Sequence, residues 1–211
     1  SSDLVAKYQD WAKAYQENQI TIIYDTMWNS TRRMAECIAE GLRETDPTLT
    51  VKLFNSAVDD KNDIVTEVFK SKAILVGSPT INYGFLFSIG GIMEMIRGLK
   101  FKNKKAAAFG SYGWSGEAVK QITALLQGAG FDVVNDGLRC QWNPDQATQE
   151  TCRQYGRDFA AAVNASEAKE DGVQTELGDY NNDEQIGKAA KEHFEDWEKD
   201  AREGVKGGYA G

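Results

Sequence analysis

Hydroxyl and amide side chains are concentrated in residues 25–31, directly after the apolar segment 20–24. Because Met34, Ile38 and Leu42 follow at helical spacing, this loop joins a predicted buried strand to the start of a helix. Backbone N–H groups at a helix start attract anions, and neighbouring hydroxyl groups add further donors. The residues suited to hold a phosphate monoester are Thr26, Asn29, Ser30 and Thr31.

The pattern of this loop differs from that of other anion-binding loops. It lacks the G-x-x-x-x-G-K-[ST] pattern of nucleotide triphosphatases and the G-x-G-x-x-G pattern of dinucleotide sites. Ser30 or Thr31 could instead only cap the helix, but a cap needs one such residue rather than a cluster. Arg32 and Arg33 could add positive charge. Since adjacent helix residues cannot both face one ligand, we expect both to be solvated.

Two further polar loops, residues 78–84 and 111–116, also follow predicted strands. Their aromatic side chains offer flat walls, and their glycines admit close approach of backbone, as a flat ring requires. Trp28, Tyr83, Tyr112 and Trp114 are candidates for stacking, or else ordinary core or surface aromatics. Together with the first loop, this predicts a flavin mononucleotide (FMN) site that also includes Met27, Trp28, Pro79, Thr80, Ile81, Asn82, Tyr83, Gly84, Ser111, Tyr112, Gly113, Trp114, Ser115 and Gly116. In such a site, we expect Gly84 and Gly113 to allow carbonyl rearrangement near the flavin N5.

Strand and helix patterns alternate along the chain and place these loops at one edge of a sheet. Strands are predicted at 20–24, 51–54, 73–77 and 106–110, with a broken one over 132–141, and helices at 30–44, 60–70, 88–98, 115–129 and 145–163. The alternation predicts an α/β fold with a parallel sheet and right-handed crossovers. Ligands of such sheets bind beyond the carboxyl ends of the strands, which is where the three loops fall.

Composition narrows the protein class. The 211 residues have no apolar stretch of eighteen residues and no signal-peptide pattern, so no membrane association is predicted. Cys37, Cys140 and Cys152 form no C-x-x-C pair, which indicates a reducing compartment, and we predict a cytoplasmic protein. Cys37 lies near the apolar helix face and is expected to be a small buried core residue. The net charge of −8 disfavours nucleic acid as a partner.

Charge also divides the chain near Asn164. Residues 1–163 carry 19 acidic and 18 basic side chains, whereas residues 164–211 carry 13 and 6. We predict a connector helix over 1–19, the FMN-binding domain over 20–163, and an acidic tail over 164–211. Within the tail, 165–185 is a predicted linker and the stripe from Ile186 to Ala201 an amphipathic helix. That helix could dock on its own domain, on a second copy in a homodimer, or on another part of the protein.

The segments 24–31, 77–82 and 110–116, with sequences YDTMWNST, GSPTIN and GSYGWSG, resemble the flavodoxin-like domain of flavodiiron proteins. The resemblance is strongest to the flavorubredoxin branch, which reduces nitric oxide or oxygen, and it covers residues 1 to about 163. It implies a flavodoxin-like three-layer sandwich with FMN as cofactor. The implied core is a five-stranded parallel sheet in the order 2-1-3-4-5, with helices on both faces.

The resemblance also implies redox partners. In that family, the domain receives electrons from rubredoxin or a similar donor and passes them to a diiron centre in a preceding metallo-β-lactamase-like domain. This chain has one histidine, His193, so we expect no diiron site and predict no catalytic or metal-binding residue.

Three alternatives have different chemistry. They are a stand-alone flavodoxin, an NAD(P)H-quinone reductase-type flavoprotein, and an interaction domain without flavin. A phosphoacceptor signalling domain is disfavoured, because Gly77-Ser78 stands where an aspartate would be needed.

Overall fold

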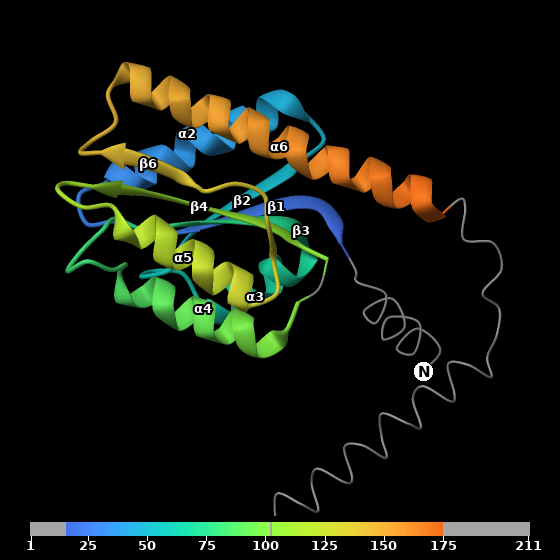
Figure 1. Cartoon of the computed structure of the whole chain (residues 1–211), viewed down its shortest axis with the longest axis horizontal. Helices are drawn as coiled ribbons and strands as arrows, with labels where there is room; N and C mark the ends of the chain where they lie inside the picture. Colours follow the sequence, from blue (N-terminus) through green and yellow to red (C-terminus); the bar gives the residue numbers. More distant parts are fainter. Residues whose placement is uncertain (1–15, 102, 175–211) are drawn as a thin grey trace, which may run out of the picture. The chain divides into compact units, whose positions relative to one another are not determined.

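The computed structural model describes residues 16–101 and 103–174, and side chains as far as residue 165. The predicted amphipathic tail helix therefore lies outside the described residues, as do residues 1–15 of the predicted connector helix. Residues 17–19, which were included in that connector helix, belong instead to the first strand, because they pair with neighbouring strands of the sheet. Within the described residues, strands and helices alternate as the sequence predicted (Figure 1). The strands are β1 Glu17–Tyr24, β2 Thr50–Asn55, β3 Ser71–Gly77, β4 Lys105–Tyr112, β5 Asp132–Val133 and β6 Leu138–Gln141, and the helices are α2 Ser30–Thr45, α3 Lys61–Lys70, α4 Phe87–Leu99, α5 Glu117–Gly128 and α6 Gln146–Gln174.

The sheet is parallel and has the order β2-β1-β3-β4-β5, which confirms the predicted topology. It has six strands rather than five, because the broken fifth strand forms two separate segments that both pair with β4. Between them, Gly137 takes a left-handed φ of 87°, and its N–H donates to Asn135 Oδ1 at 2.9 Å. This turn places β6 beside the carboxyl end of β4, where Gln141 pairs with Tyr112.

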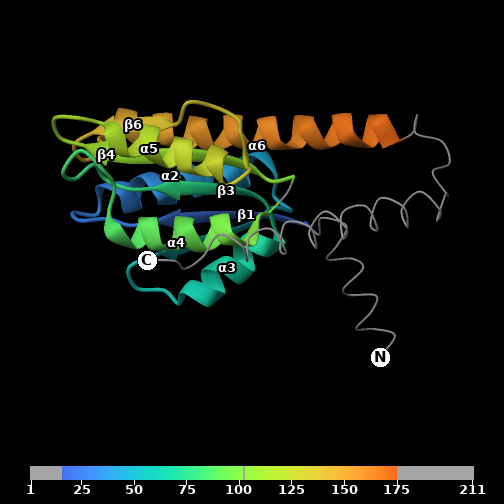
Figure 2. The same ribbon diagram turned by 60° about the horizontal axis from the view of Figure 1, so that its bottom comes forward.

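Alternate residues of the central strands face opposite helix layers. On β3, Ala73 and Leu75 belong to the core under α2 and α6, whereas Ile74 and Val76 belong to the core under α3, α4 and α5. Every residue of β3 is buried, as a strand covered on both faces requires. Figures 1 and 2 show α2 and α6 on one face of the sheet and the other three helices on the opposite face. The predicted three-layer sandwich is confirmed.

The three cysteines lie in the core under α2 and α6. Cys37, Cys140 and Cys152 are all buried and unbridged, so the prediction that Cys37 is a small core residue is confirmed. Burial raises the pKa of the Cys152 thiol to about 12, which keeps it protonated and unreactive. None of the described helices combines the length and the apolar composition needed to cross a bilayer.

Candidate functional site

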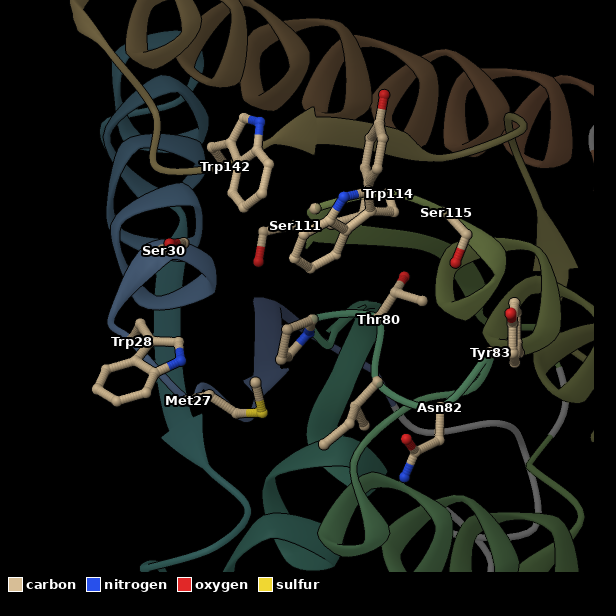
Figure 3. A pocket seen from close by; sticks show the side chains of 14 residues that line it. Met27, Trp28, Ser30, Thr80, Asn82, Tyr83, Ser111, Trp114, Ser115 and Trp142 are labelled. Atoms are coloured by element: carbon tan, nitrogen blue, oxygen red, sulfur yellow. The ribbon is translucent and has the colours of Figure 1, made fainter.

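The carboxyl ends of β1, β3, β4 and β6 surround a cavity of about 890 Å³ (Figure 3). This volume lies within the range of small-molecule sites, about 300–1,000 Å³. Most of the predicted site residues line it, whereas Thr26, Asn29, Thr31, Gly84 and Gly116 do not, and Trp142 is an addition that the sequence analysis missed. The lining residues are Met27, Trp28, Ser30, Pro79, Thr80, Ile81, Asn82, Tyr83, Ser111, Tyr112, Gly113, Trp114, Ser115 and Trp142.

The start of α2 has the backbone of an anion site. Asn29 precedes the helix with a left-handed φ of 64°, and no side chain caps the helix start. A left-handed residue followed by right-handed ones forms a concave nest of N–H groups. The Thr31 hydroxyl does not cap the helix either, because it lies 3.0 Å from the Ser111 hydroxyl at the end of β4. The simple capping interpretation of this loop is therefore wrong.

A buried hydroxyl without a partner lies beside this helix start. Thr26 Oγ1 has no hydrogen-bond partner among the described residues, although it is shielded from solvent. Such a group is costly unless a ligand satisfies it. The Thr26 N–H donates to Asp25 Oδ1 at 2.7 Å, and Asp25 Oδ2 accepts from the Ser88 hydroxyl. Asp25 thus ties the loop to α4, while the Thr26 hydroxyl is left for an acceptor such as a phosphate oxygen.

The two arginines in the first turn of α2 are solvated, as predicted. Arg32 Nε pairs with Glu36 Oε1 at 2.9 Å on the helix surface, and the Arg33 side chain is exposed. Neither lines the cavity. The positive potential for an anion therefore comes from the backbone N–H groups of the helix start.

The loop after β3 is held at both ends. The Ser78 hydroxyl accepts from the Leu86 N–H at 2.9 Å and donates to the Pro79 carbonyl, also at 2.9 Å. The Thr80 N–H donates to the Ser111 carbonyl at 2.8 Å, which joins this loop to β4. These bonds preorganise the side of the cavity formed by residues 79–83.

Backbone strain in this loop falls on residues other than the predicted glycine. Asn82 and Tyr83 have left-handed φ angles of 48° and 61°, whereas Gly84 does not. A Cβ added at Gly84 would meet Gln121 Oε1 at 3.4 Å, an ordinary contact. The expectation that Gly84 allows a carbonyl rearrangement stays a prediction, but its backbone conformation does not require glycine.

Aromatic side chains form the walls of the cavity. Trp28 is 83% exposed and Trp114 is 91% exposed, so both stand at its open rim. Trp142, from the turn after β6, meets Trp114 edge-on, with ring centroids 5.2 Å apart (Figure 3). Sequence patterns missed Trp142 because no glycine or hydroxyl cluster marks its turn. Its position just after the last strand segment was the available signal.

The chemistry of the lining is neutral. The described residues of the lining contribute hydroxyls, one amide, one thioether, aromatics and aliphatics, and none of them carries a carboxylate, amine, guanidinium or imidazole. Among residues 16–101 and 103–174, no three His, Cys, Asp or Glu side chains are grouped so as to hold a metal ion. Such a site can bind and orient a flat, phosphate-bearing molecule but offers no strong acid or base.

Comparisons with known proteins agree with this geometry. The flavodoxin family profile matches residues 22–156. The anaerobic nitric oxide reductase flavorubredoxin of Klebsiella pneumoniae is 52% identical over 159 residues, which cover 75% of this chain and 33% of that protein. The chain thus spans about a third of the length of the curated relatives it matches.

Solved structures give the same result. Rubredoxin:oxygen oxidoreductase from Desulfovibrio gigas superposes with a TM-score of 0.74 and 36% identity, covering 78% of this chain and 40% of that one. An archaeal flavodoxin superposes with a TM-score of 0.62 and 28% identity, covering 69% and 99%. FMN, the predicted cofactor, is the cofactor of flavodoxins. Since the family match spans more than half of the chain, the protein belongs to the flavodoxin family and is similar to the flavodoxin-like part of flavodiiron proteins.

Proposed function

We propose that this chain is the FMN-binding electron-transfer domain of a flavodiiron system. In this role it relays electrons from a rubredoxin-like donor to a diiron site that reduces nitric oxide or oxygen. The observation that carries the proposal is the 52% identity to a flavorubredoxin over 159 residues. The flavodoxin family match, over residues 22–156, includes the loops of the cavity. The diiron site would lie on a metallo-β-lactamase-like domain, because the described residues contain no metal cluster.

The first loop and the start of α2 would hold the phosphate. Among the described residues, the Thr26 hydroxyl has no partner and no side chain caps the N–H groups that follow Asn29. Together they offer neutral donors to a doubly charged group. Ser30, at the cavity wall, would add a hydroxyl donor. A site built from dipoles rather than cations stabilises the phosphate without a side-chain counter-charge.

The aromatic walls and the neutral lining would hold the flavin ring. Bound FMN supplies two-electron uptake and one-electron release, and the protein orients it and sets its environment. Trp28, Tyr83 and Trp114 are candidates to contact the ring, and all three are more than 70% exposed. The ring site therefore opens to solvent, so that a donor or acceptor protein can approach its edge. The lining lacks a strong acid or base and so suits electron relay more than proton-transfer catalysis.

The purified chain tests this proposal directly. After FMN addition and gel filtration, the protein should keep a flavin spectrum and a one-to-one flavin content. A reduced rubredoxin-type donor should reduce the bound flavin much faster than NADH or NADPH does. Rapid oxidation of NADH or NADPH by the chain alone would favour the quinone-reductase alternative instead. A colourless protein that rejects FMN would refute the proposal and leave an interaction domain.

The backbone at Asn29 offers a separate prediction. Valine disfavours the left-handed region and glycine adopts it freely, so Asn29→Val should distort the nest whereas Asn29→Gly should keep it. We expect the valine variant to bind FMN about tenfold more weakly, a cost of about 1.4 kcal/mol, and the glycine variant to stay within about threefold of wild type. Riboflavin, which lacks the phosphate, is the control ligand. Equal loss of riboflavin and FMN binding by Asn29→Val would contradict a phosphate-specific role.

A further inference from the structure

Trp114 stands at the cavity rim with little around it to fix its ring. Its side chain is 91% exposed, and it lies in a loop between Gly113 and Gly116. The ring contact that the structure gives it is the edge-on contact with Trp142, at an interplanar angle of 76° and a centroid distance of 5.2 Å. Such pairs are favoured electrostatically, because the positive edge of one ring meets the negative face of the other. The orientation of Trp114 therefore depends on its partner.

The turn that carries Trp142 is held firmly against the end of β4. The Trp142 N–H donates to the Tyr112 carbonyl at 2.8 Å, and Gln141 Nε2 donates to the Gly113 carbonyl at 3.1 Å. The buried Cys140 thiol lies 3.9 Å from the Trp142 carbonyl. These contacts join the two turns that carry the tryptophans, so the backbone of Trp142 is held in place next to the turn of Trp114.

Trp142 is also kept in an unfavourable backbone conformation. Its φ of 60° lies in the left-handed region, where glycine or asparagine is easier to place than a bulky residue. Its ring lies against the backbone of the neighbouring turn, since a Cβ added at Gly113 would come within 3.2 Å of it. Strain of this kind at a cavity suggests that the large ring is needed there.

We propose that Trp142 is a positioning residue that holds Trp114 in the orientation in which Trp114 forms a wall of the FMN ring site. The inference rests on the proposed function, and it assigns a role to a residue outside the three predicted loops. The turn after β6 therefore contributes to the site through the contact between Trp142 and Trp114 rather than through a hydrogen bond. Trp142 preorganises this wall before the cofactor binds, which lowers the cost of ordering an exposed side chain.

A double-mutant cycle on the whole chain tests the inference. FMN is titrated into the wild type, Trp142→Ala, Trp114→Ala and the double variant, with flavin fluorescence as the signal. Trp142→Ala should weaken FMN binding about two- to tenfold, as expected for loss of one aromatic pair. If Trp142 acts through Trp114, the double variant should bind FMN as Trp114→Ala does. Additive losses, or wild-type affinity in Trp142→Ala, would overturn the inference.

The flavin-free protein gives a second readout. Two closely spaced indoles couple, so the wild type should show an exciton band in far-ultraviolet circular dichroism that both single variants lose. Trp142→Phe should lose the band but keep most of the FMN affinity, because a phenyl edge can still meet Trp114. A wild type without the band would contradict the paired geometry. Should Trp142→Ala fail to fold, Trp142→Leu keeps the bulk without the aromatic edge and should show the same binding loss.

Phe87→Ala is a control for the loss of an exposed aromatic side chain. Phe87 is 92% exposed but does not line the cavity, so this variant should bind FMN as the wild type does.

Two outcomes distinguish failure of the inference from failure of the proposed function. A wild type that binds no FMN would refute the proposed function, and the inference with it. A wild type that binds FMN while the cycle is additive would refute the inference alone.

Discussion

Replacing Gly110 with alanine is expected to lower the free energy of unfolding by about 3 kcal/mol and to weaken FMN binding at least about tenfold. A Cβ at Gly110 would lie 2.1 Å from the Ser78 carbonyl oxygen, a contact with backbone that no rotamer change can relieve. The Ser78 N–H donates to the Phe109 carbonyl at 3.2 Å, so β4 and the loop after β3 would have to separate. The cavity wall that begins at Pro79 would move with that loop.

Thermal unfolding and FMN titration check this prediction together. For a chain of this size, 3 kcal/mol corresponds to a fall in Tm of about 10 °C. Gly91→Ala is the matched control, because its added methyl group inside α4 would meet none of the described residues within 4 Å apart from its own helix turn. That variant should be as stable as the wild type or up to about 1 kcal/mol more stable, with unchanged FMN affinity. A Gly110→Ala variant as stable as the control would show that the two strand ends are looser than the geometry implies.

Thr26→Val should have effects of opposite sign on stability and on binding. The Thr26 hydroxyl is buried and has no partner in the part of the chain that the structure describes, so its removal should stabilise the ligand-free protein by about 1 kcal/mol. Valine has nearly the same shape and leaves no cavity. The same change removes a proposed donor to the phosphate, which should weaken FMN binding about 10- to 100-fold, as for a hydrogen bond to a charged group.

The chain contains a matched control for this prediction. Thr123 Oγ1 is likewise buried without a partner among the described residues, but it lies on α5 rather than in the loop between β1 and the start of α2. Thr123→Val should therefore raise stability by a similar amount and leave FMN affinity unchanged. Differential scanning calorimetry of flavin-free protein and FMN titration measure the two effects. Equal affinity of Thr26→Val and Thr123→Val for FMN would rule out Thr26 as a phosphate ligand.

The element pattern was predictable because burial acts locally on each strand. The run 73–77 is apolar throughout, and β3 is buried throughout. The start of β1 was harder to predict, because the strand begins at the exposed Glu17 and its buried part includes two polar residues. Gln19 and Thr21 bond to Ser71, at 3.1 and 2.8 Å, so their burial depends on a partner from another strand. A pattern of apolar residues in the sequence does not predict the burial of polar residues like these.

The end of α6 was also misplaced. The predicted helix stopped at residue 163 and a linker followed, but the helix continues to Gln174. Polar composition is typical of a linker, yet Ala165, Ala168 and Glu170 are good helix formers and no proline interrupts the run. The polar composition of a segment indicates whether the segment can be buried. Whether it forms a helix also depends on the helix propensity of its residues.

By itself, the sequence determined the alternating elements, the parallel sheet and the three loops at one edge. These follow from periodicity and from the rule that parallel strands end together. Tertiary structure alone decided that the fifth strand splits, and that its second half brings Trp142 against Trp114. It also decided that the Thr26 hydroxyl is buried with no partner within residues 16–101 and 103–174. These features depend on strand register and on distances between distant residues, which local sequence patterns do not encode.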